Sequence, residues 1–131
     1  MMVYQYRRRR HALLWTTIHV KDMEKSLGFY RDVVGLDLKR RFGGAPGPEM
    51  AFLGGDGGEV ELISNGSGKE AKIGSGISIG FEVDSLTDKM AFIREKGVDI
   101  TGGPIQPSPS VRFFFVKDPD GLAVQFVENI R

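Results

Sequence analysis

The two halves of the sequence repeat one pattern of residues. An Asp-Gly pair at residues 56–57 leads into a short apolar run that ends in Asn65, and a second pair at 120–121 leads into a run that ends in Asn129. Upstream of each pair, an extended run is followed by a helical run and then by a glycine. A duplicated unit of this kind pairs its two copies, and we expect a ligand to bind at the seam between them.

Local signals predict the elements of the first copy. Apolar and polar residues alternate over 13–21, which is the pattern of a strand. Asp22 is suited to cap a helix, because its carboxylate accepts hydrogen bonds from the free amides of the first turn. Apolar residues at helical spacing then run from Met23 to Val34, and Gly35 is the expected stop. Further strands are expected at 36–42, 50–53 and 59–63.

The second copy has the same order of elements. We expect strands at 77–83, 111–117 and 122–128, and one helix at 86–96. Gly102 to Pro104 is expected to break the strand after the helix, and residues 106–110 are too rich in proline for a central strand. Each copy is therefore βαβββ. The predicted fold class is α+β, with two paired modules that form one curved, mixed sheet of eight strands and carry the helices outside.

Length and composition are those of one globular domain. The chain has 131 residues, of which 40% are hydrophobic and 27% charged. We assign a basic arm to 1–12 and a single domain to 13–131, with modules at 13–65 and 76–130 joined by a linker at 66–75. No apolar run approaches the ~20 residues that cross a bilayer, so no membrane partner is expected. The sequence has no cysteine for disulfides or thiolate chemistry, which fits a cytoplasmic location.

The basic residues are unevenly distributed. Lys and Arg number 18 against 17 Asp and Glu, and four of them form the run from Arg7 to Arg10. Without that run, 14 basic residues face 17 acidic ones, a net charge of −3 for the rest of the chain. The run is either a contact for nucleic acid or a membrane surface, or a solvated arm. We favour the arm and expect no nucleic-acid partner, because no stripe of basic and aromatic residues continues it.

Strand alternation divides the predicted sheet into two faces. The helices must cover an apolar face, and the other face then mixes aromatic, hydroxyl, amide, carboxylate and imidazole groups. Its members are Trp15, Thr17, His19, Glu59, Glu61, Ile63, Ser78, Gly80, Glu82, Ala123, Gln125 and Val127. An unpaired buried polar group costs about 1–3 kcal/mol, so we expect this mixed face to line a solvent-reachable cleft. The alternative is a face that simply points to bulk water.

Two motifs resemble those of a known family. They are residues 20–30 (VKDMEKSLGFY), followed by Val34-Gly35-Leu36, and residues 115–121 (FVKDPDG). They are similar to motifs of the vicinal oxygen chelate superfamily, which includes glyoxalase I (lactoylglutathione lyase), bleomycin resistance proteins and extradiol dioxygenases. The resemblance extends over residues 15–128 and implies the glyoxalase/bleomycin resistance fold. It is a weaker guide to chemistry, because one fold hosts many activities.

The resemblance also implies where a metal would bind. In the metal enzymes of the family, four strands each supply one ligand, and glyoxalase I uses His or Gln, Glu, His or Glu, and Glu. Those positions fall on Trp15, Glu61, Ser78 and Gln125 in this sequence. A catalytic divalent site needs about three good protein ligands, and only Glu61 is a strong one. We therefore expect no metal or other cofactor, no standard lactoylglutathione lyase reaction, and no dioxygenase reaction, which needs two His and a carboxylate.

His19 and Glu61 are the members of the mixed face that suit a general base. A rebuilt metal site of His19, Glu61 and either Glu82 or Glu59 is one interpretation. The other is a histidine hydrogen-bonded to a neighbouring carboxylate. We favour the second, because nothing in the sequence fixes the trio. His11, the other histidine, lies in the basic arm and carries no functional signal.

The mixed face predicts a binding site with an aromatic floor and acidic walls. The residues expected to bind the ligand are Trp15, Thr17, His19, Glu59, Ser78, Glu82, Phe113, Phe115 and Gln125. The aromatic members can stack on a flat or apolar ligand, although the two phenylalanines also suit a core. The carboxylates, Glu61 included, favour a cationic or hydrogen-donating ligand. The loops at 43–48 and 106–110 are the expected lids.

These observations favour a metal-independent protein that binds and sequesters a small molecule, in the manner of a bleomycin resistance protein. The alternative is an enzyme, either a glyoxalase-like lyase with a remodelled divalent-metal site or a metal-free isomerase that uses Glu61 or His19 as its base. The resemblance also implies a homodimer, since relatives in the family pair so that the edges of their clefts meet.

Overall fold

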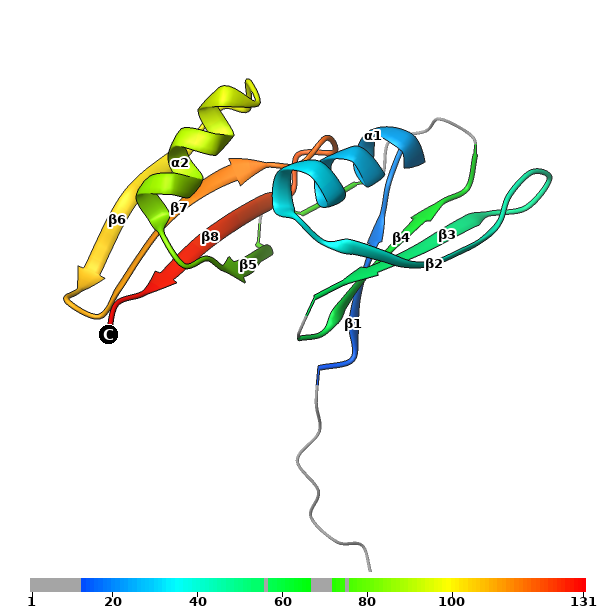
Figure 1. Cartoon of the computed structure of the whole chain (residues 1–131). Helices are drawn as coiled ribbons and strands as arrows, with labels where there is room; N and C mark the ends of the chain where they lie inside the picture. The colour runs from blue at the N-terminus through cyan, green and yellow to red at the C-terminus, as the bar shows by residue number, and fades with distance from the viewer. Residues whose placement is uncertain (1–12, 56, 67–71, 75) are drawn as a thin grey trace, which may run out of the picture.

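The structure, a computed structural model, describes residues 13–55, 57–66, 72–74 and 76–131. Two consecutive βαβββ modules account for its eight strands and its helices, and the helices lie together on one side of the sheets (Figure 1). The predicted α+β class and the glyoxalase/bleomycin resistance fold are confirmed. The arm at 1–12, with the run from Arg7 to Arg10, and most of the predicted linker lie outside the described residues. Within those residues, no helix has the length and apolar character needed to span a membrane.

The first module is a four-stranded mixed sheet with one helical segment over it. Its elements are β1 (Trp15–His19), α1 (Met23–Gly28), η1 (Phe29–Val34), β2 (Asp37–Gly43), β3 (Glu49–Gly54) and β4 (Glu59–Ser64). The strand order is β1-β4-β3-β2. β1 runs parallel to β4, and the other pairs are antiparallel.

The second module repeats this arrangement. Its elements are β5 (Ser78–Glu82), α2 (Leu86–Glu95), β6 (Gly102–Ser108), β7 (Val111–Lys117) and β8 (Ala123–Asn129). The strand order is β5-β8-β7-β6, with β5 parallel to β8. The duplication seen in the sequence is therefore a duplication of topology, strand for strand.

The prediction of one continuous eight-stranded sheet requires a correction. The eight strands form two hydrogen-bonded sheets of four. β1 and β5 each pair on one side only, with β4 and β8, so each is an edge strand of its own sheet. Sequence periodicity reports which residues share a face, but it carries no information about whether two modules join edge to edge.

The first helix begins and ends where the sequence predicts. The Asp22 side chain accepts a hydrogen bond from the Lys25 amide at 3.1 Å, and Gly35 ends the helix with a left-handed φ of 94°. The second half of the helix, Phe29–Val34, is π-helical, which the spacing of apolar residues did not indicate. In α2, Ser85 provides the same kind of cap by accepting from the Asp88 amide.

β6 differs from the prediction. The glycines and proline at 102–104 do not break the strand but begin it, and residues 106–108, expected in a lid, belong to it. β6 is the outer strand of its sheet and its ladder with β7 has two register shifts. Proline lacks an amide hydrogen, so it is tolerated on an edge strand whose outer side has no partner.

One apolar core lies beneath the helices and extends through both modules. Tyr30, Phe114 and Phe126 are completely buried in it. Polar contacts join the modules on the same side: the Tyr30 hydroxyl donates to Asp118, and the Lys89 amine donates to the carbonyl of Val33 at 2.6 Å. Burial lowers the pKa of that amine. The space between the helices and the sheets is therefore occupied by this core, and we sought a ligand site on the other side of the sheets.

Candidate functional site

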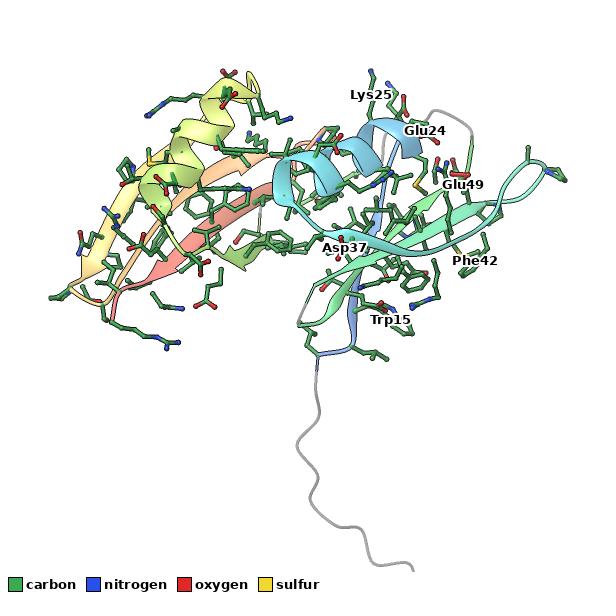
Figure 2. All side chains as sticks on the ribbon, in the orientation of Figure 1. Trp15, Glu24, Lys25, Asp37, Phe42 and Glu49 are labelled. Carbon is green, nitrogen blue, oxygen red and sulfur yellow. The ribbon has the colours of Figure 1, made fainter. Side chains whose placement is uncertain are left out.

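The surface of each sheet that faces away from the helices is here named the open face. In the first module it carries Trp15 and Phe42, which point away from α1, whereas Glu24 and Lys25 lie on the helix side (Figure 2). The alternation along β1 explains the division: Ile18 is buried under the helix, and its neighbours Thr17 and His19 are exposed. The predicted assignment of residues to two faces agrees with this burial pattern.

Glu61 lies at the middle of the first open face. It pairs in register with Thr17 on one side and Phe52 on the other. Only 9% of Glu61 is exposed, and its Oε1 accepts a 2.7 Å hydrogen bond from the Thr17 hydroxyl. A single neutral donor leaves most of the acceptor capacity of an ionised carboxylate unused. Glu61 is thus a buried charge that is held in place and can still accept from a ligand.

Glu59, expected in an acidic wall, is paired with a cation that sequence reasoning missed. The Arg40 guanidinium donates to both of its carboxylate oxygens, at 2.8 and 3.3 Å. The hydrogen bond to Glu59 holds the pKa of Arg40 above its ordinary value. Gly54 makes room for this bridge, because a Cβ there would come within 3.2 Å of the Glu59 Cγ. The open face is therefore less acidic than the prediction of three free glutamates implies.

Three aromatic rings gather next to Glu61. Trp15 meets Phe52 edge to face with ring centroids 5.5 Å apart, and Phe42 stacks on Phe52 at 6.0 Å. Phe52 is buried at their centre, whereas 45% of Trp15 and 47% of Phe42 remain exposed. The aromatic floor predicted around Trp15 is thus built from Phe42 and Phe52, which sequence reasoning did not select. Strand alternation could have indicated Phe52, because it pairs in register with Glu61, and Met50, two residues earlier, pairs with Ile63 on the same face.

The second open face carries a neutral residue, Gln125, at the position that corresponds to Glu61 in the first. The amide of Gln125 lies 3.5 Å from the Ser78 hydroxyl, to which it donates. Gly80 leaves space for this side chain, since a Cβ there would meet the Gln125 Cγ at 3.3 Å. Glu82 accepts a hydrogen bond from the Asn129 amide. Two of the expected residues of this half, Ser78 and Gln125, therefore contact each other, whereas Glu82 contacts Asn129, which was not among the expected residues.

Phe113 and Phe115 lie on the second open face and not in the core. They pair in register with Val127 and Gln125, and both are half-buried. Their rings meet edge to face at 5.7 Å. Phe114, between them, points to the helix side and is completely buried. Of the two interpretations left open by the sequence, the core position is not observed, because both rings lie half-buried on the open face.

The structure does not assemble the metal site considered for His19. His19 pairs in register with Ile63 and lines a cavity of about 560 Å³ at the seam between the modules. Within the described residues, His19 forms no hydrogen bond or ion pair with a carboxylate, and the favoured histidine–carboxylate pair stays a prediction. No group of three or more His, Cys, Asp or Glu side chains in the described part of the chain is arranged to hold a metal ion.

The four family positions are divided between the two sheets. Trp15 and Glu61 belong to the first sheet, and Ser78 and Gln125 to the second. None of the four lines the cavities of about 560 and 620 Å³ at the seam. Each open face therefore carries two of the four family positions.

The donor chemistry of these positions does not fit the divalent metal that the fold implies. Trp15 has no lone pair to offer a metal, and Ser78 is a weak ligand that already accepts from Gln125. Glu61 is the one strong ligand of the set. One carboxylate, one amide and one hydroxyl fall short of the ligand set of a catalytic divalent site.

The loop at 43–48 lies beside the start of α1 and not over the open face. It borders a cavity of about 350 Å³ together with Asp22, Glu24 and Arg41. Arg41 forms ion pairs with Glu24 and Glu49 at the rim of this cavity. The expectation that this loop covers the ligand on the open face is therefore not supported by its position.

Comparison with known proteins adds the following similarities. The family model described as Glyoxalase/Bleomycin resistance protein/Dioxygenase superfamily matches residues 12–126. The lactoylglutathione lyase of Haemophilus influenzae is 33% identical over 128 residues, which cover 89% of this chain and 92% of that protein. A probable lactoylglutathione lyase of Synechocystis is 34% identical over 128 residues, covering 89% of this chain and 95% of that protein.

Two solved structures share the fold. The trypanothione-dependent glyoxalase I of Leishmania major superposes with a TM-score of 0.77 at 25% identity and covers 92% of this chain and 87% of its own. TnmS3, an antibiotic binding protein from a Streptomyces species, superposes with a TM-score of 0.70 at 22% identity and covers 95% of this chain and 99% of its own. The second likeness concerns the fold alone.

Proposed function

Because the chain belongs to the glyoxalase, bleomycin resistance protein and dioxygenase superfamily, we propose that it binds a flat small molecule on the open face of its first sheet. The observation that carries the proposal is Glu61, a carboxylate only 9% exposed that Thr17 holds at 2.7 Å. It lies next to the half-exposed ring of Trp15. A buried acceptor beside exposed aromatic rings suits a ligand that is planar and carries an N–H, an O–H or a positive charge.

The proposed mechanism is sequestration without chemistry. The ligand ring stacks on Trp15, and its donor group reaches the free acceptor positions of Glu61. An aromatic pair contributes about 0.5–1.5 kcal/mol, and a hydrogen bond to a charged group contributes about 1.5–3 kcal/mol. Their sum falls short of the roughly 8 kcal/mol that a micromolar Kd requires. The site therefore needs a second wall.

A second copy of the chain is the proposed source of that wall. In such a homodimer the second open face of one subunit, with Phe115 and Gln125, covers the first open face of its partner. Among the described strands, the outer edges of β1 and β5 have no partner, and this supports the association because such edges are ready to pair. Sedimentation velocity tests it: a dimer is expected, and a monomer at every concentration would contradict it.

A second function is favoured by the likeness to lactoylglutathione lyases. A lyase or isomerase of this type would have to work without the usual ligand set, since Trp15 and Ser78 stand at two of the family positions. It would use Glu61 or His19 as its general base, with a metal held by a remodelled set of donors or with none. The donor set at the four family positions does not fit a metal.

Two assays on the purified protein separate these functions. Trp15 is the only tryptophan, so its fluorescence reports binding on the first open face directly. Binding predicts a saturable response to flat aromatic probes, no stoichiometric metal, and no turnover of the hemithioacetal of methylglyoxal and glutathione. One tightly held divalent metal per chain together with turnover would replace the binding function by the enzymatic one.

We also propose that the protein is cytoplasmic and has no nucleic-acid partner. The support is a sequence without cysteine and a net charge of +1. The single strongly basic run, from Arg7 to Arg10, lies outside the described residues. Retention of the protein on a DNA column at low salt, with release as salt increases, would contradict this part.

A further inference from the structure

The guanidinium of Arg40 lies over the Phe52 ring on the first open face. Its Cζ lies 4.3 Å from the centroid of the Phe52 ring, and two hydrogen bonds to the Glu59 carboxylate fix the plane of the guanidinium. A guanidinium fixed by a two-point bond to a carboxylate loses little further entropy when a ligand stacks on it. Arg40 is thus an ordered planar cation within the proposed site.

A β-bulge in β2 creates this position. Leu38 pairs with Leu53, and the next register pair is Arg40 with Phe52, so Lys39 is the extra residue. Without the bulge, side chains two residues apart would share a face. With it, Leu38 packs against the core while Arg40 turns to the open face. A bulge that re-aims one side chain beside a site is a recurring device in sheets.

The outer side of the Arg40 guanidinium is available to a ligand. About half of the side chain, 48%, is exposed, although its inner side rests on Phe52. Trp15 and Phe42, each close to half exposed, flank the same ring. Two of the N–H groups are used by Glu59, and a guanidinium has five. Together these groups form a ring-sized platform with a cation at its centre.

Glu61 lies one strand spacing, about 5 Å, from this platform, because Phe52 is its register partner on β3. A ring stacked on Arg40 can therefore direct a substituent to Glu61. The substituent must donate a hydrogen bond, since an ionised carboxylate only accepts. The ring itself meets positive charge at contact distance, which attracts the negative face of an electron-rich ring and repels a cationic ring.

We propose that Arg40 is the residue that determines ligand class, and that the ligand is an electron-rich, hydroxylated aromatic compound of the phenol or naphthol type and not a cationic ring. The proposal rests on the proposed function, because it requires that a ligand binds on this face. The sequence predicted a cationic ligand from three glutamates, and the proposal differs in the ligand class. The ligand ring stacks on Arg40, which itself lies on Phe52, and the ligand hydroxyl donates to Glu61.

Equilibrium dialysis with two probes of equal ring size tests the proposal. The probes are 2-naphthol and N-methylquinolinium, and the protein is the full chain. The wild type is expected to bind 2-naphthol roughly tenfold more tightly, the size of a partly desolvated cation–π contact. Arg40→Met, which keeps the length of the side chain and removes the cation, is expected to abolish this preference. Arg40→Lys, which keeps the charge without the plane, is expected to retain part of it.

Arg41→Met is the matched control. Arg41 is the next residue of the same strand, also forms ion pairs, and points to the helix side. It is expected to keep the wild-type preference for 2-naphthol. Thermal unfolding of each variant identifies any that fails to fold. If Arg40→Met does not fold, the preference of Arg40→Lys for 2-naphthol is compared with that of the wild type instead.

The outcomes separate two failures. If neither probe binds the wild type, or if binding survives Trp15→Ala, the proposed function itself is wrong and this inference falls with it. If both probes bind but the quinolinium binds as tightly as the naphthol, or if Arg40→Met leaves the preference unchanged, the role of Arg40 is wrong and the proposed function stands.

Discussion

The Tyr30 hydroxyl donates a 2.8 Å hydrogen bond to the carboxylate of Asp118. Both residues are buried, and the bond joins the helix of the first module to the turn between β7 and β8 of the second. The other oxygen of Asp118 accepts from the amides of Asp120 and Leu122, each at 2.9 Å. Asp118 thus has three donors, and the turn that opens β8 is tied to the helix. The motifs that carry the family resemblance meet at this contact.

Tyr30→Phe is expected to destabilise the protein by about 1.5–3 kcal/mol, because it removes a hydrogen bond to a buried charge while leaving that charge in place. Urea denaturation measures the loss. Ser110→Ala, on the exposed turn after β6, serves as a control and is expected to change stability by less than about 0.5 kcal/mol. Equal stability of wild type and Tyr30→Phe would show that the bond does not hold the modules together.

The same contact predicts a dependence on alkaline pH. Burial, and then the charge of Asp118, raise the pKa of Tyr30 far above its ordinary value of 10.0. A pKa that is raised in the folded state contributes stability that is fully present below the pKa of the unfolded state. This stability is lost as pH increases, because the tyrosine ionises in the unfolded state at a lower pH than in the folded state. Above about pH 10 the wild type should lose up to ~1.4 kcal/mol per pH unit relative to Tyr30→Phe. Parallel stability curves for the two proteins would contradict this.

Glu128 predicts a dependence on acidic pH. Its carboxylate accepts from the Leu86 amide at the start of α2 at 2.6 Å and from Arg112. The hydrogen bond from Leu86 is the main cause that lowers the pKa of Glu128. A lowered pKa contributes stability that is present above the unfolded value and is lost as pH decreases. The melting temperature of Glu128→Gln should therefore change less than that of the wild type between about pH 6 and about pH 3; an equal change would refute the cap.

Glu61→Gln tests the acceptor in the binding site. The substitution keeps the shape of the side chain and replaces a charged acceptor by a neutral one, so binding of 2-naphthol should weaken roughly tenfold. Thr17→Val, which removes the donor that orients Glu61, should weaken binding to a smaller extent. Glu49→Gln, on the same sheet but paired with Arg41 at its rim, is the control. Undiminished binding by Glu61→Gln would remove Glu61 from the site.

Much of the fold could be predicted from the sequence, because its signals are local. Asp22 and Gly35 marked the ends of the first helix through capping and backbone preference. Strand alternation assigned Trp15, Thr17 and Glu61 to one face, and the register pairing of Thr17 with Glu61 agrees. Each of these inferences needs only the residues within one element.

The rest depended on relations between elements. The bulge at Lys39 arises from the pairing of β2 with β3, and nothing in residues 37–43 alone indicates it, so Arg40 was missed. The neutralisation of Glu59 followed from that omission. The position of β6 at a sheet edge, which tolerates its prolines, likewise depends on the order of strands and not on the strand itself.

Titration of Trp15 fluorescence in protein freed of metal by chelation tests the central claim most directly. We predict a saturable change in fluorescence with 2-naphthol that does not become larger when Zn²⁺ or Ni²⁺ is added back. Trp15→Phe, which lacks the fluorophore, is the blank and should show no change. A response that appears only after metal is restored, together with turnover of the hemithioacetal, would contradict it.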